Sequence, residues 1–403
     1  MAKTIPAGWQ EKTLGEVCKI SSGNSAPQLI SLFENGKYPF FRTSDVGSIH
    51  FGNIYSSHDY LNDNGIKGLR LFKKGTILFP KSGASTFLNH RVKMACDGYV
   101  VSHLAAIIAC NKVINEDYLL YFLSIIDSKK LIQDGNYPSL NLSVISSIKI
   151  RFPPLSEQER IVAKLDKAFE AIDKAKAIAE NNLKNAKELF ESSLNKAFTE
   201  NTNDWEEKTL VELCNIEIGK TPSRSNIKFW DKTRSTNNTW LSIADLNNAQ
   251  NKKVFSSKEQ ISDLATQYMK LVKEGTLLLS FKLTIGRVAF AGKDLYTNEA
   301  IAQLPIKNEQ KIDKHYLYYY LQYFDYEKLL KGDVKVKGKT LNKEKLKALP
   351  VCYPPLPEQQ KIVKKLDALH EQTKQLEQIY TQKIKNCDEL KQSILKRAFR
   401  GEL

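Results

Sequence analysis

The chain has 403 residues, of which 42% are hydrophobic and 26% charged, so it is long enough for two or three domains with apolar cores. A formal net charge of +15 favours a polyanionic partner, with nucleic acid as the leading candidate. A basic protein with a solvated, lysine-rich surface is the alternative, which charge alone does not exclude. The sequence shows no secretory leader or membrane span, and its six cysteines form no CxxC pair. We therefore expect a cytoplasmic protein without a membrane partner, a disulfide framework or a zinc ribbon.

Residues 1–152 and residues 201–353 are predicted to be two domains of the same type. Each opens with a tryptophan, Trp9 or Trp205, beside an apolar-periodic segment, which favours a core position for the indole over base stacking. Short β-branched and aromatic runs separated by glycine follow, and they predict strands after tight turns. Together with the predicted helices, these strands indicate an α+β protein with two mixed α/β domains in tandem.

A tyrosine-rich helix is predicted near the end of each domain, over residues 117–123 and residues 315–321. Its helical spacing favours core packing of the tyrosines over stacking on bases. Between such shared stretches the two domains diverge, for example at residues 79–91 and residues 280–287. If these loops face a ligand, the two domains recognise different structures.

A long helix is predicted after each domain, over residues 153–200 and residues 354–403. Each residue of the first copy lies 201 positions before its counterpart without a gap, and 20 of 46 aligned pairs are identical. The chain is therefore a tandem duplication, with two helices of roughly 65 Å that serve as spacers or dimerising arms. Alternate steps of four and three between seam residues predict a coiled coil. The seam residues are Ile161, Leu165, Ala168, Ile172, Ala175 and Ala179 in the first copy, and Ile362, Leu366, Leu369, Thr373, Leu376 and Tyr380 in the second.

Motifs for catalysis, cofactor binding or metal binding are not found in the sequence. The six histidines form neither HxH nor HExxH spacing, and there is no GxSxG elbow, glycine-rich cofactor loop or Asn-Pro-Pro-aromatic motif. The basic loop at residues 332–340 is not an NTPase phosphate loop, because five residues rather than four separate its glycines. Its lysines nevertheless suit phosphate contacts. The chain is therefore predicted to be non-catalytic, with no metal or cofactor of its own.

The start of each long helix carries the pattern Pro-Pro-Leu-x-Glu-Gln-x-x-Ile-Val-x-Lys-Leu-Asp, at residues 153–166 and residues 354–367. Two unlike domains, each followed by this pattern, make essentially the whole chain similar to the specificity subunit of type I restriction-modification enzymes. Supporting stretches are residues 101–105, 219–223, 240–246 and 298–301. The first domain departs from the second at residues 23–27, so the loops there need not correspond.

This resemblance implies that the two domains are target-recognition domains, each binding one half of a split site in double-stranded DNA. It implies that the two long helices pack antiparallel, with pseudo-two-fold symmetry, and separate the domains. It further implies two methyltransferase subunits that methylate adenine N6 with S-adenosylmethionine and, in the full enzyme, two restriction subunits that use ATP and Mg²⁺. Because the two domains differ in sequence, we expect an asymmetric bipartite target.

Candidate contact residues are chosen by side-chain type, because cationic and hydrogen-bonding groups suit phosphates and base edges in the major groove. The candidates for DNA binding are Arg42, Arg70, Lys81, His90, Arg91, Lys220, Thr221, Arg224, Arg234, Lys282, Arg287, Lys335, Lys337 and Lys339. The candidates for binding partner subunits, at the helix starts, are Glu157, Gln158, Arg160, Glu358, Gln359 and Lys361. Two alternatives stay open. One is a coiled-coil scaffold or DNA-binding interaction protein without sequence preference, and the other is an enzyme with an unrecognised nuclease or methyltransferase site.

Overall fold

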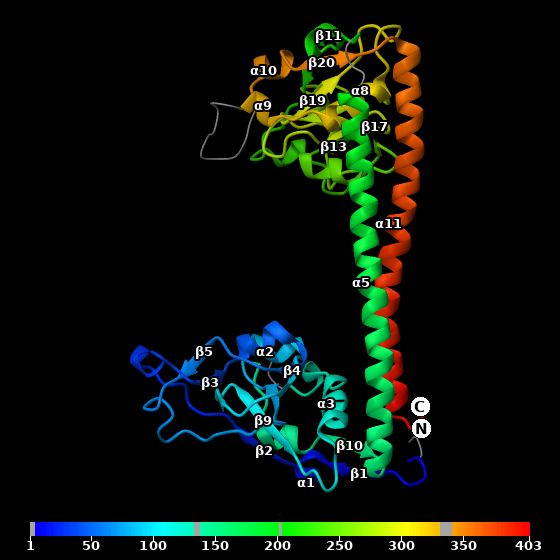
Figure 1. Ribbon diagram of the computed structural model, residues 1–403. Helices are drawn as coiled ribbons and strands as arrows, with labels where there is room; N and C mark the ends of the chain where they lie inside the picture. The colour runs from blue at the N-terminus through cyan, green and yellow to red at the C-terminus, as the bar shows by residue number, and fades with distance from the viewer. Residues whose placement is uncertain (1–4, 133–137, 201–203, 331–340) are drawn as a thin grey trace. The chain divides into compact units, whose positions relative to one another are not determined.

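The computed structural model describes residues 5–132, 138–200, 204–330 and 341–403. The chain forms two compact units: the first comprises residues 1–180 together with residues 381–403, and the second comprises residues 181–380. Each unit therefore contains one globular domain and a part of each long helix (Figure 1). The last residues of strands β10 (Lys149–Phe152) and β20 (Pro350–Tyr353) lie at the predicted ends of the two domains.

Mixed sheets build the domain of the first unit. Its remaining strands are β1 (Gln10–Thr13), β2 (Cys18–Ser22), β3 (Tyr38–Phe41), β4 (Phe51–Ile54), β5 (Asp59–Leu61), β6 (Ile77–Pro80), β7 (Arg91–Met94), β8 (Tyr99–Val100) and β9 (Leu104–Ala109). They form a five-stranded sheet in the order β2-β9-β6-β7-β4, a three-stranded sheet in the order β5-β3-β8, and a pair of β1 with β10. Strand pairing is antiparallel except between β4 and β7 and between β3 and β8.

Short helices connect these strands. They are α1 (Leu14–Val17), η1 (Ile30–Leu32), α2 (Thr43–Ile49), η2 (Ala84–Leu88), α3 (Glu116–Ser124), η3 (Ser128–Lys130) and α4 (Leu142–Ser146). The predicted tyrosine-rich helix is α3, and the side chain of Asn115 caps it by accepting from the backbone NH groups of Asp117 and Tyr118. Tyr118 and Tyr121 are buried, which confirms their predicted core role.

The domain of the second unit repeats the first strand for strand. Its sheets have the orders β12-β19-β16-β17-β14, β15-β13-β18 and β11-β20, so each strand matches the one numbered ten lower. The duplication therefore covers the whole domain. The strands are β11 (Glu206–Thr209), β12 (Glu217–Ile218), β13 (Thr239–Leu241), β14 (Lys253–Val254), β15 (Glu259–Gln260), β16 (Leu277–Ser280), β17 (Val288–Ala291), β18 (Tyr296–Thr297) and β19 (Ile301–Leu304). The helices are α6 (Leu210–Leu213), η4 (Ile227–Phe229), η5 (Ile243–Asn248), α7 (Asp263–Thr266), α8 (Lys314–Tyr323), α9 (Glu327–Leu330) and α10 (Lys343–Lys347).

The five-stranded sheet of each domain is buried on both faces. In β6, Ile77 and Phe79 point into the core that contains α3, whereas Leu78 points into the core shared with the three-stranded sheet. Leu277 and Leu278 of β16 divide in the same way. Alternate strand residues thus serve two cores, which explains the continuous apolar runs of these strands. The three-stranded sheet is the outer sheet layer of each domain, and in the second unit Phe229 of η4 and Ala265 of α7 pack against its far face.

The two long helices are α5 (Leu155–Thr199) and α11 (Leu356–Ala398), and they pack antiparallel within each unit (Figure 1). In the first unit, Lys176 pairs with Asp388 and Lys391 pairs with Asp173, so residue numbers rise along one helix as they fall along the other. In the second unit, the rings of Phe190 and His370 lie 5.0 Å apart, and Lys196 and Glu200 line one groove with Glu358 and Ile362, so residue numbers again run in opposite directions. These contacts confirm the antiparallel arrangement inside each unit.

The predicted seam is wrong at one position in each helix copy. Ala175 and its counterpart Leu376 are exposed, whereas the following residue, Lys176, turns inward toward the other helix. The cause is two successive steps of four, from Ile161 to Leu165 and on to the buried Phe169. A straight helix has 3.6 residues per turn, so an unbroken 4,3 alternation drifts off the contact line.

Candidate nucleic-acid interface

Arg42 lies between β3 and α2, and its guanidinium packs over two aromatic rings. The guanidinium carbon is 5.7 Å from the ring centroid of Phe33 and 5.2 Å from that of Phe40. The side-chain Nε donates to the carboxylate of Asp59, the first residue of β5. The backbone NH donates to Asp45 in the first turn of α2, so both ends of the residue are held. With 36% of its side chain exposed, this restrained guanidinium can meet a ligand at little further cost in side-chain entropy.

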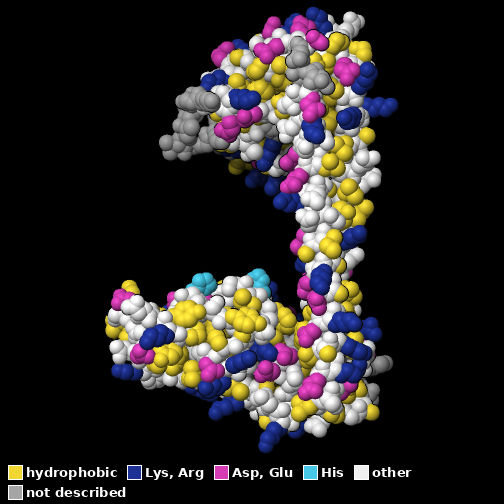
Figure 2. Space-filling view, in the orientation of Figure 1, with side chains coloured by type: hydrophobic (Ala, Val, Ile, Leu, Met, Phe, Trp, Pro, Cys, Tyr) yellow, Lys and Arg dark blue, Asp and Glu magenta, His cyan; other side chains and the backbone are white. Residues whose placement is uncertain are grey.

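His90, another candidate, stacks on a second histidine at the domain surface. The rings of His50 and His90 have centroids 4.4 Å apart, and His50 adopts a φ of 67°, which costs a non-glycine residue about 1–2 kcal/mol. Burial lowers the pKa of His90, and His50 and Arg91 lower it further, so the imidazole is neutral at pH 7. Figure 2 shows histidines (cyan) on the surface of the first unit. His90 therefore presents an uncharged ring that can donate or accept, stacked on the ring of His50.

Arg91 corrects the sequence prediction, because it is fully buried and cannot touch DNA in this structure. Its guanidinium lies 3.5 Å from the ring centroid of Phe79 and donates to the backbone oxygen of His90 and the hydroxyl of Ser128. Burial lowers its pKa to about 9, which leaves the group charged at neutral pH. Arg91 is the first residue of β7, a strand buried along its whole length, so its position in the sheet decides its role.

The other candidates of the first domain lie in loops. Arg70 is exposed, and its guanidinium carbon is 4.8 Å from the ring centroid of Phe72. Lys81 is half-buried directly after β6, where its backbone NH donates to the oxygen of His103. Both remain predicted DNA contacts.

Arg224, in the loop before η4, is held in the second unit much as Arg42 is in the first. Its guanidinium carbon lies 3.9 Å from the Trp230 ring centroid and 5.1 Å from that of Trp240. Both terminal nitrogens donate to Glu259, the first residue of β15, and these bonds raise the pKa of Arg224. A cavity of about 380 Å³ opens beside the pair, with Lys232 in its lining. Arg224, Lys232, Arg234 and Lys258 all line this cavity, together with Asp231 and Glu259.

Two further arginine candidates are tied to the backbone of their own domain. Arg234 donates to the carbonyl oxygens of Ser257 and Lys258, at 3.0 and 3.1 Å, and has a φ of 59°. Arg287 donates to the carbonyl oxygen of Ile243 at 3.3 Å. These bonds fix loops around the outer sheet layer, and DNA contact by either side chain remains a prediction.

The remaining described candidates of the second domain are Lys220, Thr221 and Lys282. The backbone oxygen of Lys220 accepts from the indole NH of Trp240 at 3.0 Å, and the hydroxyl of Thr221 donates to Glu299. The ammonium of Lys282 lies 5.3 Å from the ring of the preceding phenylalanine. Thr221 is therefore engaged by a carboxylate, whereas Lys220 is exposed.

Lys335, Lys337 and Lys339 lie outside the residues that the structure describes. Within the described ranges, His, Cys, Asp and Glu side chains form no group of three or more that could hold a metal ion. No helix in those ranges combines the length and apolar character needed to cross a membrane.

Gln158 and Gln359 correct the prediction for partner binding, because both are fully buried. The side-chain oxygen of Gln158 accepts from the backbone NH of Asn115, and its amide donates to the carbonyl oxygens of Val113 and Pro153. Gln359 repeats these three bonds with Asp313, Lys311 and Pro354. The two glutamines thus bind each helix start to its own domain, which leaves no surface for a partner.

The other partner-binding candidates form exposed ion pairs on the first turns of the helices. Arg160 donates to Glu157 and also to the backbone oxygen of Leu403 at 2.7 Å. Lys361 pairs with Glu358 at 3.0 Å. Their exposure is compatible with partner contact, which remains a prediction.

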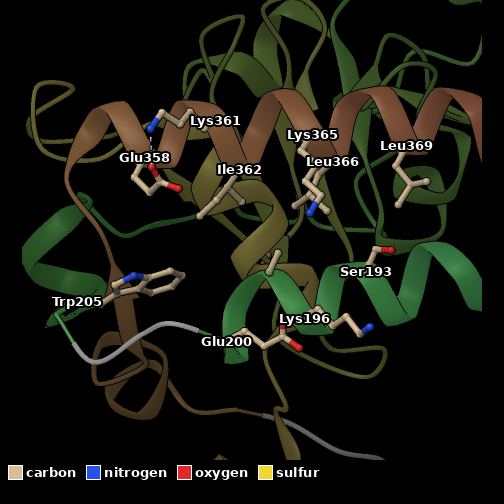
Figure 3. Close-up of a pocket in the computed structure, with 11 residues that line it drawn as sticks. Ser193, Lys196, Glu200, Trp205, Glu358, Lys361, Ile362, Lys365, Leu366 and Leu369 are labelled. Carbon is tan, nitrogen blue, oxygen red and sulfur yellow. Dashed lines mark hydrogen bonds and ion pairs between the residues drawn. The ribbon is translucent and has the colours of Figure 1, made fainter.

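In the second unit, Glu358 and Lys361 border a groove between the start of α11 and the end of α5 (Figure 3). The groove measures about 320 Å³, and Trp205, Ile362 and Leu366 supply its apolar surface. Lysines and glutamates at its rim make it amphipathic.

Sequence reasoning missed the contact that joins each domain to its long helix. The hydroxyl of Tyr121 donates to Asp166 at 2.6 Å, and that of Tyr319 donates to Asp367 at 2.6 Å. In the second unit, Lys252 also pairs with Asp367. Both aspartates belong to the repeated helix pattern and both tyrosines to the repeated tyrosine-rich helix, so the repeats did carry a signal for this contact.

Comparison with known proteins agrees with this architecture. The family model for the type I restriction modification DNA specificity domain matches twice, over residues 6–183 and residues 202–386. The type I restriction enzyme MjaIX specificity subunit of Methanocaldococcus jannaschii is 29% identical over 175 residues, which cover 42% of this chain and 40% of that protein. The EcoDI specificity subunit of Escherichia coli is 22% identical over 432 aligned positions, covering 100% of this chain and 90% of that protein.

Solved structures share the fold over the full length. A chain from a study of complex assembly and conformational transition of the type I R-M system has a TM-score of 0.81 and 22% identity, covering 99% of this chain and 100% of that one. The HsdS subunit from Thermoanaerobacter tengcongensis has a TM-score of 0.63 and 22% identity, covering 100% and 99%. Since the family model matches both domains and the adjoining helices, the chain belongs to the family of type I restriction-modification DNA specificity subunits.

Proposed function

We propose that the two units of this specificity subunit bind the two halves of an asymmetric bipartite DNA target. The supporting observation is that one backbone frame occurs twice with different side chains at equivalent places. His58 and Lys258 occupy the same turn, because the backbone NH of each donates to a buried aspartate, Asp45 or Asp245. Different side chains in one frame offer different hydrogen-bonding groups to base edges, so the two half-sites differ in sequence.

Binding would combine phosphate contacts, which position the protein, with base contacts, which give specificity. The net charge of +15 supplies long-range attraction to DNA and makes the affinity fall as salt rises. The restrained guanidiniums of Arg42 and Arg224 are suited to base edges, because planar donors match pairs of acceptors.

We infer that the chemistry lies on partner subunits. Adenine methylation would be performed by two methyltransferase subunits with S-adenosylmethionine, and cleavage by restriction subunits with ATP and Mg²⁺. Two similar helix starts, with exposed ion pairs at Glu157–Arg160 and Glu358–Lys361, suit two copies of one partner. Because the ligand is DNA, we place the complex in the cytoplasm.

The paired helices would set the distance between the half-sites. Their antiparallel packing within each unit supports a stiff connection. Inserting one heptad into both helices lengthens each by roughly 10 Å, so the spacing between the two motifs should increase by about three base pairs. A heptad in only one helix misaligns the charged pairs and should abolish recognition. Unchanged spacing in a folded double insertion would refute this role.

The decisive experiment is to express the chain with its methyltransferase partner in a host free of adenine methylation, and to sequence all N6-methyladenines. We expect two short, different motifs at one fixed spacing. A single contiguous motif would contradict the bipartite target, and methylation without sequence preference would favour the scaffold alternative. Methyl transfer by the purified chain alone would favour the enzyme alternative.

A further inference from the structure

The three-stranded sheet of each unit contains an aromatic residue paired with an acidic one. Phe40 of β3 lies opposite Asp59 of β5, and Trp240 of β13 lies opposite Glu259 of β15. A second aromatic residue follows a short 3₁₀ segment in each unit. These residues are Phe33, after η1, and Trp230, after η4. Two aromatic rings and one carboxylate thus occupy equivalent positions in the two repeats.

A guanidinium sits at this position in both units, but it comes from different segments of the chain. Arg42 follows β3, whereas Arg224 precedes η4. The second-unit residue equivalent to Arg42 is Ser242, because each donates its backbone NH to the aspartate three residues later, Asp45 or Asp245. Duplication alone therefore does not account for the second arginine. The two units share a guanidinium between aromatic rings and a carboxylate, but a different segment of the chain supplies the arginine in each unit.

Both guanidiniums are restrained yet open to solvent. The side chain of Arg42 is 36% exposed and that of Arg224 is 55% exposed. Arg42 uses Nε for its carboxylate, and its two terminal nitrogens have no hydrogen-bond partner among the residues that the structure describes. Arg224 gives one hydrogen of each terminal nitrogen to Glu259, so its remaining parallel donors are the Nε hydrogen and the second hydrogen of the neighbouring terminal nitrogen, and the cavity of about 380 Å³ lies beside the guanidinium.

This arrangement exceeds what stability requires. An exposed ion pair contributes only about 0–1 kcal/mol, so a stacked and paired arginine at the surface of both domains has little structural justification. Stacking and the carboxylate instead fix the plane of the guanidinium before a ligand arrives. A planar group with two parallel donors matches the O6 and N7 acceptors of guanine in the major groove.

We propose that Arg42 and Arg224 are the specificity-determining arginines of the two half-sites, each donating to the O6 and N7 edge of one guanine. Asp59 and Glu259 are positioning residues that act through these arginines. The inference rests on the proposed DNA recognition, and it assigns one guanine to each unit.

The test uses the complete methyltransferase complex and a library in which every base pair of the wild-type target is replaced in turn. Arg42→Lys should lower discrimination by about 10- to 100-fold at one G·C pair of one half-site, because lysine keeps the charge but loses the planar pair of donors. Arg224→Lys should do the same at one pair of the other half-site. Uniform weakening at all positions would identify a phosphate contact and overturn the proposal, as would unchanged discrimination.

Arg151→Lys is the matched control. Arg151 is also 36% exposed and also donates Nε to a carboxylate, that of Glu11, but it belongs to β10 rather than to the outer sheet layer. Its replacement should leave base discrimination unchanged. For the positioning role, Asp59→Asn should reduce discrimination at the Arg42 position, and Asp59→Glu should restore it.

A second measurement needs no protein variant. Replacing the assigned guanine of each half-site by 7-deazaguanine removes N7 alone, and we expect about 10-fold weaker binding by the wild-type complex. Unchanged affinity at both guanines would overturn the proposal even if a variant failed to fold. Absence of any bipartite motif for the wild type would instead refute the proposed function, so the two failures are distinguishable.

Discussion

The two units join domain to helix through the same contact, a tyrosine hydroxyl that donates to a helix aspartate. Tyr121 and Asp166 form it in the first unit, and Tyr319 and Asp367 form it in the second, both at 2.6 Å. Burial raises the pKa of both tyrosines, so both hydroxyls keep their protons at any ordinary pH. The hydrogen bond has been retained through the divergence of the two repeats.

The neighbours of this contact differ between the units. In the first unit, Phe51 packs on Tyr121 with ring centroids 5.3 Å apart. In the second unit, Lys252 binds Asp367, and its ammonium lies 4.4 Å from the ring of Tyr319. The first joint is therefore supported by apolar burial and the second by charge. The two repeats therefore share the hydrogen bond between tyrosine and aspartate, whereas the side chains packed around it differ in type.

The largest expected difference between the units concerns the phenylalanine at the end of each long helix, which is Phe198 in the last turn of α5 and Phe399 directly after α11. Phe198 is 5% exposed and packs against three tyrosine rings, whereas Phe399 is half-buried against two aromatic rings. Phe198→Ala should cost the second unit about 3–5 kcal/mol of unfolding free energy, and Phe399→Ala should cost the first unit roughly 2 kcal/mol. Urea-dependent hydrogen exchange of α8 and α3 measures each unit separately. Equal losses would show that the exposed part of Phe399 does not matter.

The next largest effect is the loss of the glutamine hydrogen bonds at the start of each long helix, and it should be equal in the two units. Gln158→Leu and Gln359→Leu each leave one part-buried NH, one part-buried carbonyl and one buried carbonyl without their amide partner. We expect each variant to lose about 2–3 kcal/mol of unfolding free energy in its own unit. Hydrogen exchange at the first turns of α3 and α8 reports the loss. A large effect in only one unit would mean that the repeated bonds are not equivalent in strength.

Features carried by periodicity and repetition could be predicted from the sequence. The duplication, the tyrosine-rich core helices and the long helices follow from residue patterns, whereas the antiparallel packing of the long helices is what the family resemblance implies. The structure confirms the core helices and the antiparallel packing within each unit. The predicted coiled-coil seam is wrong at Ala175 and Leu376. A pattern that alternates spacings of four and three residues cannot show where two successive spacings of four shift the line of contact between the helices.

The candidate site was less accessible to sequence reasoning. Residue type suggested Arg91 and Arg42 alike, yet one is buried in a strand and the other is exposed over two rings. Gln158 looked like a surface residue of a polar helix start, and only the fold reveals the three backbone groups around it. Burial is set by contacts between distant segments, which periodicity does not encode.

A smaller effect should distinguish the charged contact between domain and helix in the second unit from the apolar contact in the first. Only the charged contact should contribute a stability that depends on pH. The pKa of Asp367 is lowered, although burial opposes this, because Lys252 and Tyr319 donate to the carboxylate. A depressed folded pKa gives stability that is present above the ordinary aspartate value of about 4 and is lost as pH falls through the folded value. Since Asp367 is 46% exposed, the contribution is at most about 1 kcal/mol.

Lys252→Met tests this joint. The second unit of the variant should be less stable than wild type at pH 7, and the difference should shrink as pH falls below about 4. Urea midpoints measured between pH 3 and pH 7 would show the convergence. Phe51→Leu in the first unit is the apolar counterpart and should lower stability by a similar amount at every pH. Parallel pH curves for Lys252→Met and wild type would contradict the electrostatic support.

The smallest expected effect concerns ion pairs on the surface of α5, one in each unit. Lys174 pairs with Glu170 at 2.6 Å in the first unit, and Lys184 pairs with Glu188 at 3.6 Å in the second. A glutamate four residues before a lysine is the better orientation, so Lys174→Ala should cost about 0.3 kcal/mol and Lys184→Ala less. Both lysines are 72% exposed, and salt should remove the difference. A thermal shift in the assembled complex larger than in the isolated chain would place that lysine in a partner interface, which would locate partner binding along α5 rather than at the helix starts alone.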